Sequence, residues 1–218
     1  MSAWLWISQT HYPVHALGPG NRLTVWVQGC TLSCKGCMSR DTWSADGGVE
    51  TSVEDLAELW RSAVGQGADG LTVSGGEPLQ QADGLSAFLA AADEVRRGAA
   101  RELDFLVYTG YDEDELDEPR RAALSLADVV VFGRFEVANP TELVWRGSAN
   151  QRMVPRTELG ELRYADFIDY APEQGPLQIE VRGNDPWIIG TPRKEALRNL
   201  DRSLKGVGLR ITDTTWRP

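Results

Sequence analysis

The chain has 218 residues, enough for one ordinary domain and a small appendage, and its 42% hydrophobic and 25% charged residues are typical of a globular protein. Its net charge of −10 argues against nucleic acid as a partner, because binding to a phosphate backbone depends on lysine and arginine. Its longest apolar runs are strand-sized and its N-terminus lacks the pattern of a signal peptide, so we expect a cytoplasmic protein with no membrane partner.

Strand and helix patterns alternate along the first 135 residues. In chain order they predict a strand over Leu23–Cys30, a helix over Thr51–Gly65, a strand over Gly70–Pro78, a helix over Leu85–Val95, a strand over Asp104–Tyr111, an acidic helix-like stretch within Tyr111–Arg121 and a strand over Asp128–Phe135. Thr51 and Glu54 resemble a capping box. This order predicts right-handed crossovers and a mostly parallel sheet, whose functional groups gather beyond the carboxyl ends of the strands.

The character of the sequence changes after about Met153. A turn-rich segment over Pro155–Gly175 precedes the remaining predicted elements, which are a strand pair over Leu177–Gly183 and Trp187–Gly190, a helix with Leu197, Leu200 and Leu204 on one face, and a final strand over Leu209–Thr212. We therefore expect two units, a core of residues 1–153 and a C-terminal α/β extension of residues 154–218, packed on or beside the core.

All three cysteines of the chain, Cys30, Cys34 and Cys37, lie within eight residues in the pattern C-x3-C-x2-C. They cannot all pair with one another, so the cluster suits a metal better than a disulfide framework. Three thiolates at the corners of a cubic iron–sulfur cluster would leave one iron open to an exchangeable ligand. Structural zinc is the alternative, and it would need a fourth ligand from His11 or His15, which lie in a loop-like segment upstream.

A second motif, Gly75-Gly76-Glu77-Pro78, ends a predicted strand. Its two glycines allow a ligand to approach the backbone, and Pro78 favours an extended Glu77 that presents its carboxylate at the sheet edge, where it would suit an ammonium group. Taken alone the motif is more often a structural turn. The cysteine loop, this turn and Thr109–Tyr111 all follow predicted strands, so we expect them to converge at one edge of the sheet.

Together the two motifs resemble the radical S-adenosylmethionine (radical SAM) superfamily. The resemblance implies a partial (β/α)6 barrel, a [4Fe–4S] cluster held by Cys30, Cys34 and Cys37, and S-adenosylmethionine (SAM) chelated to the fourth iron. It also implies reductive cleavage of SAM to a 5′-deoxyadenosyl radical that removes a hydrogen atom from the substrate. The SAM-binding residues that it implies are Gly36, Met38, Gly75, Gly76, Glu77 and Thr109, with Gly110 as a weaker candidate. Trp43 would either shield the cluster or serve as an ordinary packing residue.

Five blocks from about Gly18 to Met153 look similar to the small activating enzymes of anaerobic (class III) ribonucleotide reductase: GPGNRLTVWVQGC, CKGCMSRDTW, SGGEPL, YTGYDEDEL and LVWRGSANQ. This resemblance implies that the protein abstracts hydrogen from a glycine of a partner reductase, with a flavodoxin or ferredoxin as reductant. Because the compact activases lack the segment after Met153, a stand-alone radical SAM enzyme that modifies a peptide or a small metabolite is the first alternative. A non-catalytic iron–sulfur or zinc-binding module is the second, and it would leave the glycine-rich turn unexplained.

Overall fold

The computed structural model describes residues 3–182, 185–206 and 208. Its main feature is a sheet with the strand order β3-β1-β2-β4-β5-β6-β7. The bounds of these strands are β1 Trp4–Val14, β2 Arg22–Val27, β3 Val49–Ser52, β4 Gly70–Gly75, β5 Asp104–Tyr108, β6 Val129–Phe132 and β7 Arg152–Pro155. The inner strands β2, β4, β5 and β6 run parallel, and antiparallel strands extend the sheet at both sides. The prediction of a mostly parallel central sheet is confirmed.

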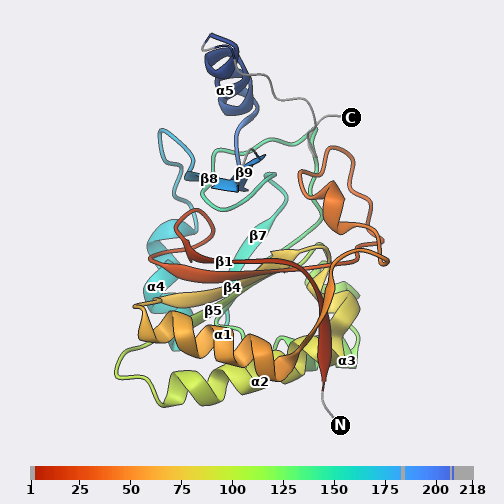
Figure 1. Cartoon of the computed structure of the whole chain (residues 1–218), viewed down its shortest axis with the longest axis vertical. Helices are drawn as coiled ribbons and strands as arrows, with labels where there is room; N and C mark the ends of the chain where they lie inside the picture. The colour runs from red at the N-terminus through yellow and green to blue at the C-terminus, as the bar shows by residue number, and fades with distance from the viewer. Residues whose placement is uncertain (1–2, 183–184, 207, 209–218) are drawn as a thin grey trace.

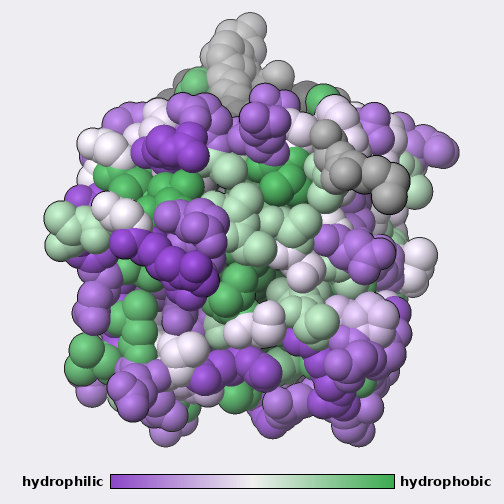
Figure 2. Space-filling model, turned by 90° about the horizontal axis from the view of Figure 1, so that it is seen from below, coloured by the Kyte–Doolittle hydropathy of each residue, from purple (hydrophilic) through white to green (hydrophobic). Residues whose placement is uncertain are grey.

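One face of the sheet carries the helices α1 (Val53–Gly65), α2 (Ala82–Arg97) and α3 (Glu118–Ala123) (Figure 1). Alternate residues of the inner strands, including Val25 and Val107, pack into a core with Trp60 and Phe88 of the helices, all fully buried. Figure 2 looks at the molecule from this helical side and shows hydrophilic residues spread between hydrophobic ones. None of the described helices is long and apolar enough to cross a membrane.

We call the opposite face of the sheet the inner face. It is covered by segments from distant parts of the chain, among them α4 (Glu158–Tyr164), whose Tyr164 is fully buried. Leu106 and Val131 pack there against Trp145 and Tyr164, and Trp26 packs in a second cluster with buried residues of the segment after β1. The inner face is therefore a second, smaller core with several aromatic side chains.

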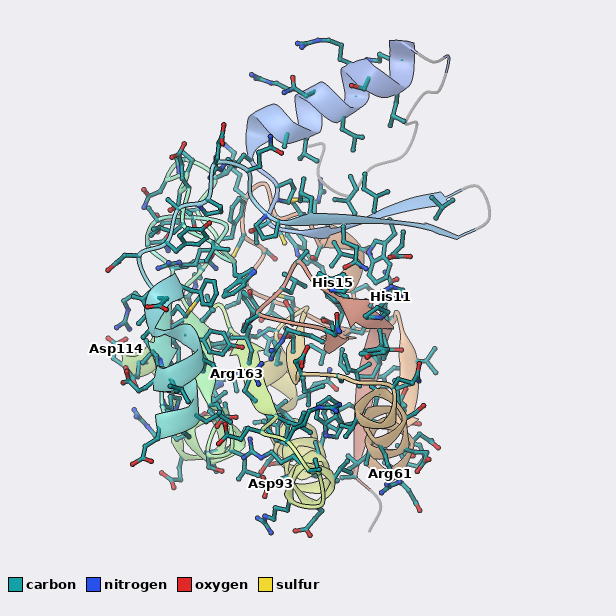
Figure 3. All side chains as sticks on the ribbon, turned by 90° about the vertical axis from the view of Figure 1, so that its left-hand side faces the viewer. His11, His15, Arg61, Asp93, Asp114 and Arg163 are labelled. Carbon is teal, nitrogen blue, oxygen red and sulfur yellow. The ribbon has the colours of Figure 1, made fainter. Side chains whose placement is uncertain are left out.

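The extension contains a hairpin of β8 (Leu177–Arg182) and β9 (Asp185–Gly190), followed by α5 (Lys194–Gly206). The hairpin lies over β1 and the inner face, with the ring of Trp187 4.9 Å from that of Trp26 and 5.5 Å from that of His11. Gln178 fixes it further, because its side chain donates to the Pro13 carbonyl at 2.9 Å. Figure 3 shows His11 and His15 beneath this hairpin.

The predicted strand pair and helix of the extension are thus confirmed within the described residues. The final strand predicted over Leu209–Thr212 lies outside them. The boundary expected at residue 153 falls within β7, which pairs with β6, and the division of the chain into two units stays a prediction.

Two local expectations were wrong. His11 lies in the strand β1 and not in a loop. The helix α1 is capped by Ser52, whose hydroxyl accepts from the Asp55 N–H at 3.0 Å, because Thr51 is engaged in β3 opposite Leu5. Within the mixed, turn-rich segment after β7 the structure adds the short helix α4, which Thr157 caps.

Candidate metal centre

The cysteine loop and the glycine-rich turn meet at the carboxyl ends of β2 and β4. The Glu77 N–H donates to the Gly29 carbonyl at 2.9 Å, and the Gly76 N–H donates to the Val27 carbonyl at 2.8 Å. From its other side the loop is held by the Gly29 N–H, which donates to the Thr42 carbonyl at 2.7 Å. The two motifs therefore form one hydrogen-bonded unit, as the sequence predicts.

The two glycines of the turn are required by this close contact. Gly75 has a φ of +102°, and a Cβ on it would lie 2.6 Å from the Val27 nitrogen. A Cβ on Gly76 would lie 2.3 Å from the Gly29 carbonyl oxygen. The backbone at the base of the cysteine loop thus lies directly against the two glycines. From the sequence we expected only a ligand to approach them.

The carboxylate of Glu77 is buried, with 1% of the residue exposed. Its Oε1 accepts from the Thr109 hydroxyl at 2.8 Å and from the Leu79 N–H at 2.9 Å, and its Oε2 accepts from the Gly110 N–H at 2.7 Å. Burial raises the pKa of Glu77, while these three donors lower it in part. The carboxylate lies at the sheet edge, where β4 and β5 end, but it is buried and accepts from donors of the chain. Its contact with an ammonium group of a ligand stays a prediction.

The three cysteines are free and half-buried. The Cys37 N–H donates to the Cys34 carbonyl at 3.1 Å, and positive φ angles of 49° at Ser33 and 77° at Gly36 help to turn the loop. Burial raises the pKa of the Cys30 and Cys37 thiols, and the nearby Cys34 raises both further. Without a metal these thiols hold their protons, so a metal has to displace them on binding.

Trp43 lies directly at the cluster loop. A hydrogen bond from its side chain lowers the pKa of the Cys37 thiol against the larger effect of burial. The Arg40 guanidinium lies over its ring at 5.6 Å from the centroid. This position is compatible with shielding, which the sequence left open beside ordinary packing.

The donor set decides which group the loop fits. Across residues 3–182, 185–206 and 208, no three His, Cys, Asp or Glu side chains are gathered into a ready-made metal site. His11 is occupied elsewhere, since its Nε2 lies 3.4 Å from Glu180 Oε1. A closed structural zinc site needs four protein ligands, whereas three thiols on one loop suit a cluster with one open iron.

The comparison with protein families gives the same assignment. The family described as 4Fe-4S single cluster domain matches residues 16–154, a stretch that includes all three cysteines and the glycine-rich turn. The chain belongs to this family.

Its relatives specify the family further. The chain is 40% identical over 151 residues to the anaerobic ribonucleoside-triphosphate reductase-activating protein of Haemophilus influenzae, a match that covers 65% of this chain and 92% of the relative. The protein of the same name from Vibrio cholerae is 40% identical over 148 residues, with the same coverage. That of Enterobacteria phage T4 is 32% identical over 143 residues and is covered to 88%. The chain thus belongs with these activating proteins, and about a third of it lies outside the match.

No role for the segment Trp145–Met153 follows from its residues alone, and the structure shows one. The Gln151 side chain donates to the Gly133 carbonyl at 2.9 Å, and that of Asn150 donates to the Arg134 carbonyl at 2.8 Å. The segment therefore braces the chain that leaves β6. The only signal in the sequence was its resemblance to a block of the activating enzymes.

Proposed function

We propose that this protein is a radical SAM enzyme that activates an anaerobic ribonucleotide reductase. The observation that carries the proposal is the hydrogen bond from the Glu77 N–H to the Gly29 carbonyl at 2.9 Å, which joins the candidate cluster loop to the candidate cofactor turn. The similarity to reductase-activating proteins over 65% of the chain supports the same function. The parallel strands with their helices support a partial (β/α)6 barrel of the superfamily.

In this proposal Cys30, Cys34 and Cys37 would hold a [4Fe–4S] cluster, and the iron without a cysteine ligand would be left for SAM. Once bound, the reduced cluster and SAM together supply a 5′-deoxyadenosyl radical that removes a hydrogen atom from a glycine of the reductase. A flavodoxin or ferredoxin would deliver the electron, and the reaction would take place in the cytoplasm.

The residues of the chain itself bind and orient. Gly36 and Met38, on either side of Cys37, would flank the adenosine. The turn of Gly75 and Gly76 would meet the methionyl end. Glu77 is buried beneath that turn and accepts from Thr109, so it would keep the turn in position. Its Oε1 accepts two hydrogen bonds and its Oε2 accepts one, so Oε2 is the oxygen with fewer donors.

A second candidate is a stand-alone radical SAM enzyme that acts on a peptide or a small metabolite. The extension favours it, since the hairpin residue Trp187 packs on Trp26 of the inner face and the compact relatives match only 65% of this chain. In this case the hairpin would form a wall of the substrate pocket.

Anaerobic reconstitution with iron and sulfide tests these functions. We expect about four irons per chain, with SAM cleaved by the dithionite-reduced protein to 5′-deoxyadenosine and methionine. We also expect a glycyl-radical signal in electron paramagnetic resonance (EPR) when an anaerobic ribonucleotide reductase is present. Cleavage without any glycyl radical would favour the stand-alone enzyme. Bound zinc and intact SAM would contradict both and leave a passive metal-binding module.

A further inference from the structure

The inner face carries rows of side chains that follow the register of the parallel strands. Closest to the metal centre lies the row of Trp26, Ser74, Tyr108 and Val131. Behind it lies the row of Thr24, Thr72, Leu106 and Val129. Tyr108 is the last residue of β5 and directly precedes Thr109, whose hydroxyl holds Glu77. The phenol of Tyr108 therefore lies on the inner face directly behind the metal centre.

Several buried polar atoms on this side of the molecule have no hydrogen-bond partner in the described structure. Among them are the Tyr108 hydroxyl, the Arg146 Nε and the Trp145 Nε1. All three are donors, and Arg146 and Trp145 are 6% and 4% exposed. A buried donor without an acceptor costs free energy, so such atoms in a folded protein call for an explanation.

The chain brings Arg146 next to Tyr108 by the brace described above. The Gln151 Oε1 accepts from the Gly147 N–H at 2.7 Å, which folds the segment back on itself. One terminal nitrogen of Arg146 donates to the Ile168 carbonyl, which fixes the guanidinium while the Nε stays unused. Tyr108 packs against the cluster that contains Trp145, the residue directly before Arg146, and neither the Tyr108 hydroxyl nor the Arg146 Nε has a hydrogen-bond partner in the described structure. In line with this position, the charge of Arg146 lowers the pKa of Tyr108 against the larger effect of burial, which raises it.

A second tyrosine on the same face shows what a satisfied hydroxyl looks like here. Tyr164 is fully buried, and its hydroxyl donates to Asp104 Oδ1 at 2.6 Å. Asp104 also accepts from Arg22, so both ends of that bond are occupied. The Tyr164 hydroxyl thus has an acceptor and the Tyr108 hydroxyl has none, while Tyr164 is fully buried and Tyr108 is partly buried. The two residues form a pair for comparison by experiment.

We propose that Tyr108 and Arg146 form a subsite that binds an acceptor oxygen of a ligand, either a carboxylate or an amide carbonyl, on the inner face behind the metal centre. The two sources of such an oxygen are the carboxylate of SAM and the peptide backbone of a polypeptide substrate. The assignment of the site to these two ligands rests on the proposed function. The chemistry of the subsite does not, because two unpaired donors, one of them charged, suit any acceptor of this kind.

The test uses the reconstituted protein with tyrosine labelled at ¹³Cζ, a nucleus whose resonance responds to hydrogen bonding of the phenol. SAM, N-acetylglycinamide and acetate are added separately, and the Tyr108 resonance is assigned by its loss in Tyr108→Phe. We expect it to shift with SAM if the cofactor carboxylate binds there, or with N-acetylglycinamide if a peptide does. Acetate supplies the same kind of acceptor oxygen, so it should shift the Tyr108 resonance in either case. In Tyr108→Phe the dissociation constant for the active probe, measured by calorimetry, should rise about tenfold.

Thermal unfolding of the ligand-free variants supplies a readout independent of activity. Tyr108→Phe should leave the melting temperature unchanged or raise it, since it removes a donor that has no acceptor, whereas Tyr164→Phe should lower it. A Tyr108→Phe variant as destabilised as Tyr164→Phe, or a Tyr108 resonance that none of the probes moves, would overturn the subsite. Failure of the proposed function is distinguishable, because SAM then stays intact under dithionite while acetate still shifts the resonance.

Discussion

Each end of the four parallel strands has a buried carboxylate, and the partners of the two carboxylates differ. At the amino ends Arg22 and Asp104 are both 0% exposed, and the guanidinium donates to Asp104 Oδ1 at 2.6 Å. Thr72 accepts from Arg22, and Arg163 reaches from α4 toward the sheet, 2.9 Å from Asp104 Oδ2 (Figure 3). At the carboxyl ends the similarly buried carboxylate of Glu77 accepts from neutral donors, and no arginine among the described residues forms a hydrogen bond with it.

Within one sheet, the amino ends of the strands thus carry a stabilising network, and the carboxyl ends carry the candidate functional site. The ionic network at the amino ends is paired and hydrogen-bonded within the chain, so it holds the strands and α4 together. At the carboxyl ends lie the glycines of the turn, the free thiols of the cysteine loop and the unpaired hydroxyl of Tyr108, the last residue of β5. Ligands of open parallel sheets bind at this end, and the metal centre follows that rule.

Replacing Cys34 by Ser should have the largest effect on function, because it removes one of three candidate cluster ligands. We expect the iron content after reconstitution to fall sharply and SAM cleavage to fall by roughly 100-fold or more. Lys35→Gln, an exposed change in the same loop, is the control and should keep both. Full cluster content in Cys34→Ser would remove this cysteine from the ligand set.

Asp104→Asn should have the largest effect on stability. It leaves the buried Arg22 guanidinium without its counter-charge, which costs about 3–5 kcal/mol in the free energy of unfolding measured with urea. The matched control is Glu58→Gln, which breaks an exposed pair with Arg61 and should change that free energy by less than about 0.5 kcal/mol. Equal effects of the two variants would refute the stabilising role of the buried ionic network at the amino ends.

Gly76→Ala tests the contact between the two motifs. The added Cβ would meet the Gly29 carbonyl oxygen at 2.3 Å, so we expect a loss of about 1–3 kcal/mol and a poorly reconstituted cluster. Gly65→Ala, at the end of α1 with nothing within 4 Å of the new Cβ, should instead stabilise the protein by about 0.5–1 kcal/mol. Normal iron content in Gly76→Ala would show that the motifs need not touch.

The smallest effect is expected from the exposed pair of Glu115 and Arg134, which belongs to the carboxyl side. Hydrogen bonds from Arg134 lower the pKa of Glu115 from 4.5 to about 2. A carboxyl whose pKa is lowered by folding stabilises the folded state at every pH above its pKa in the unfolded chain. This contribution disappears as the pH falls from 4.5 toward 2. The melting temperatures of wild type and Glu115→Gln should therefore differ slightly at pH 5 and converge on acidification. A constant difference would contradict this origin.

The convergence of the motifs was predictable because each motif follows a strand of the same parallel sheet, so its position depends on strand order alone. The burial of Glu77 was not, because its donors Thr109 and Gly110 lie 32 and 33 positions away along the chain. The strand β1 was missed since Trp4 and Trp6 are 49% and 44% exposed, which hides the alternation with buried Leu5.

The ionic network at the amino ends escaped prediction for the same physical reason. Arg22 and Asp104 are 82 positions apart, and Tyr164 joins from another 60 positions away. A single sequence shows such residues as ordinary surface charges, and only the packed fold reveals that they are buried together. At both ends of the strands, hydrogen-bond and ion-pair partners that lie far apart in the chain could thus not be predicted from the sequence.

Binding of SAM to the metal centre can be measured in the EPR spectrum of the reduced cluster, recorded with and without SAM. If the three cysteines leave one iron open beside the Gly75–Gly76 turn, SAM should bind that iron and change the g-values of the reduced [4Fe–4S] signal. An intact four-iron cluster with an identical spectrum in both samples would show that SAM does not bind there.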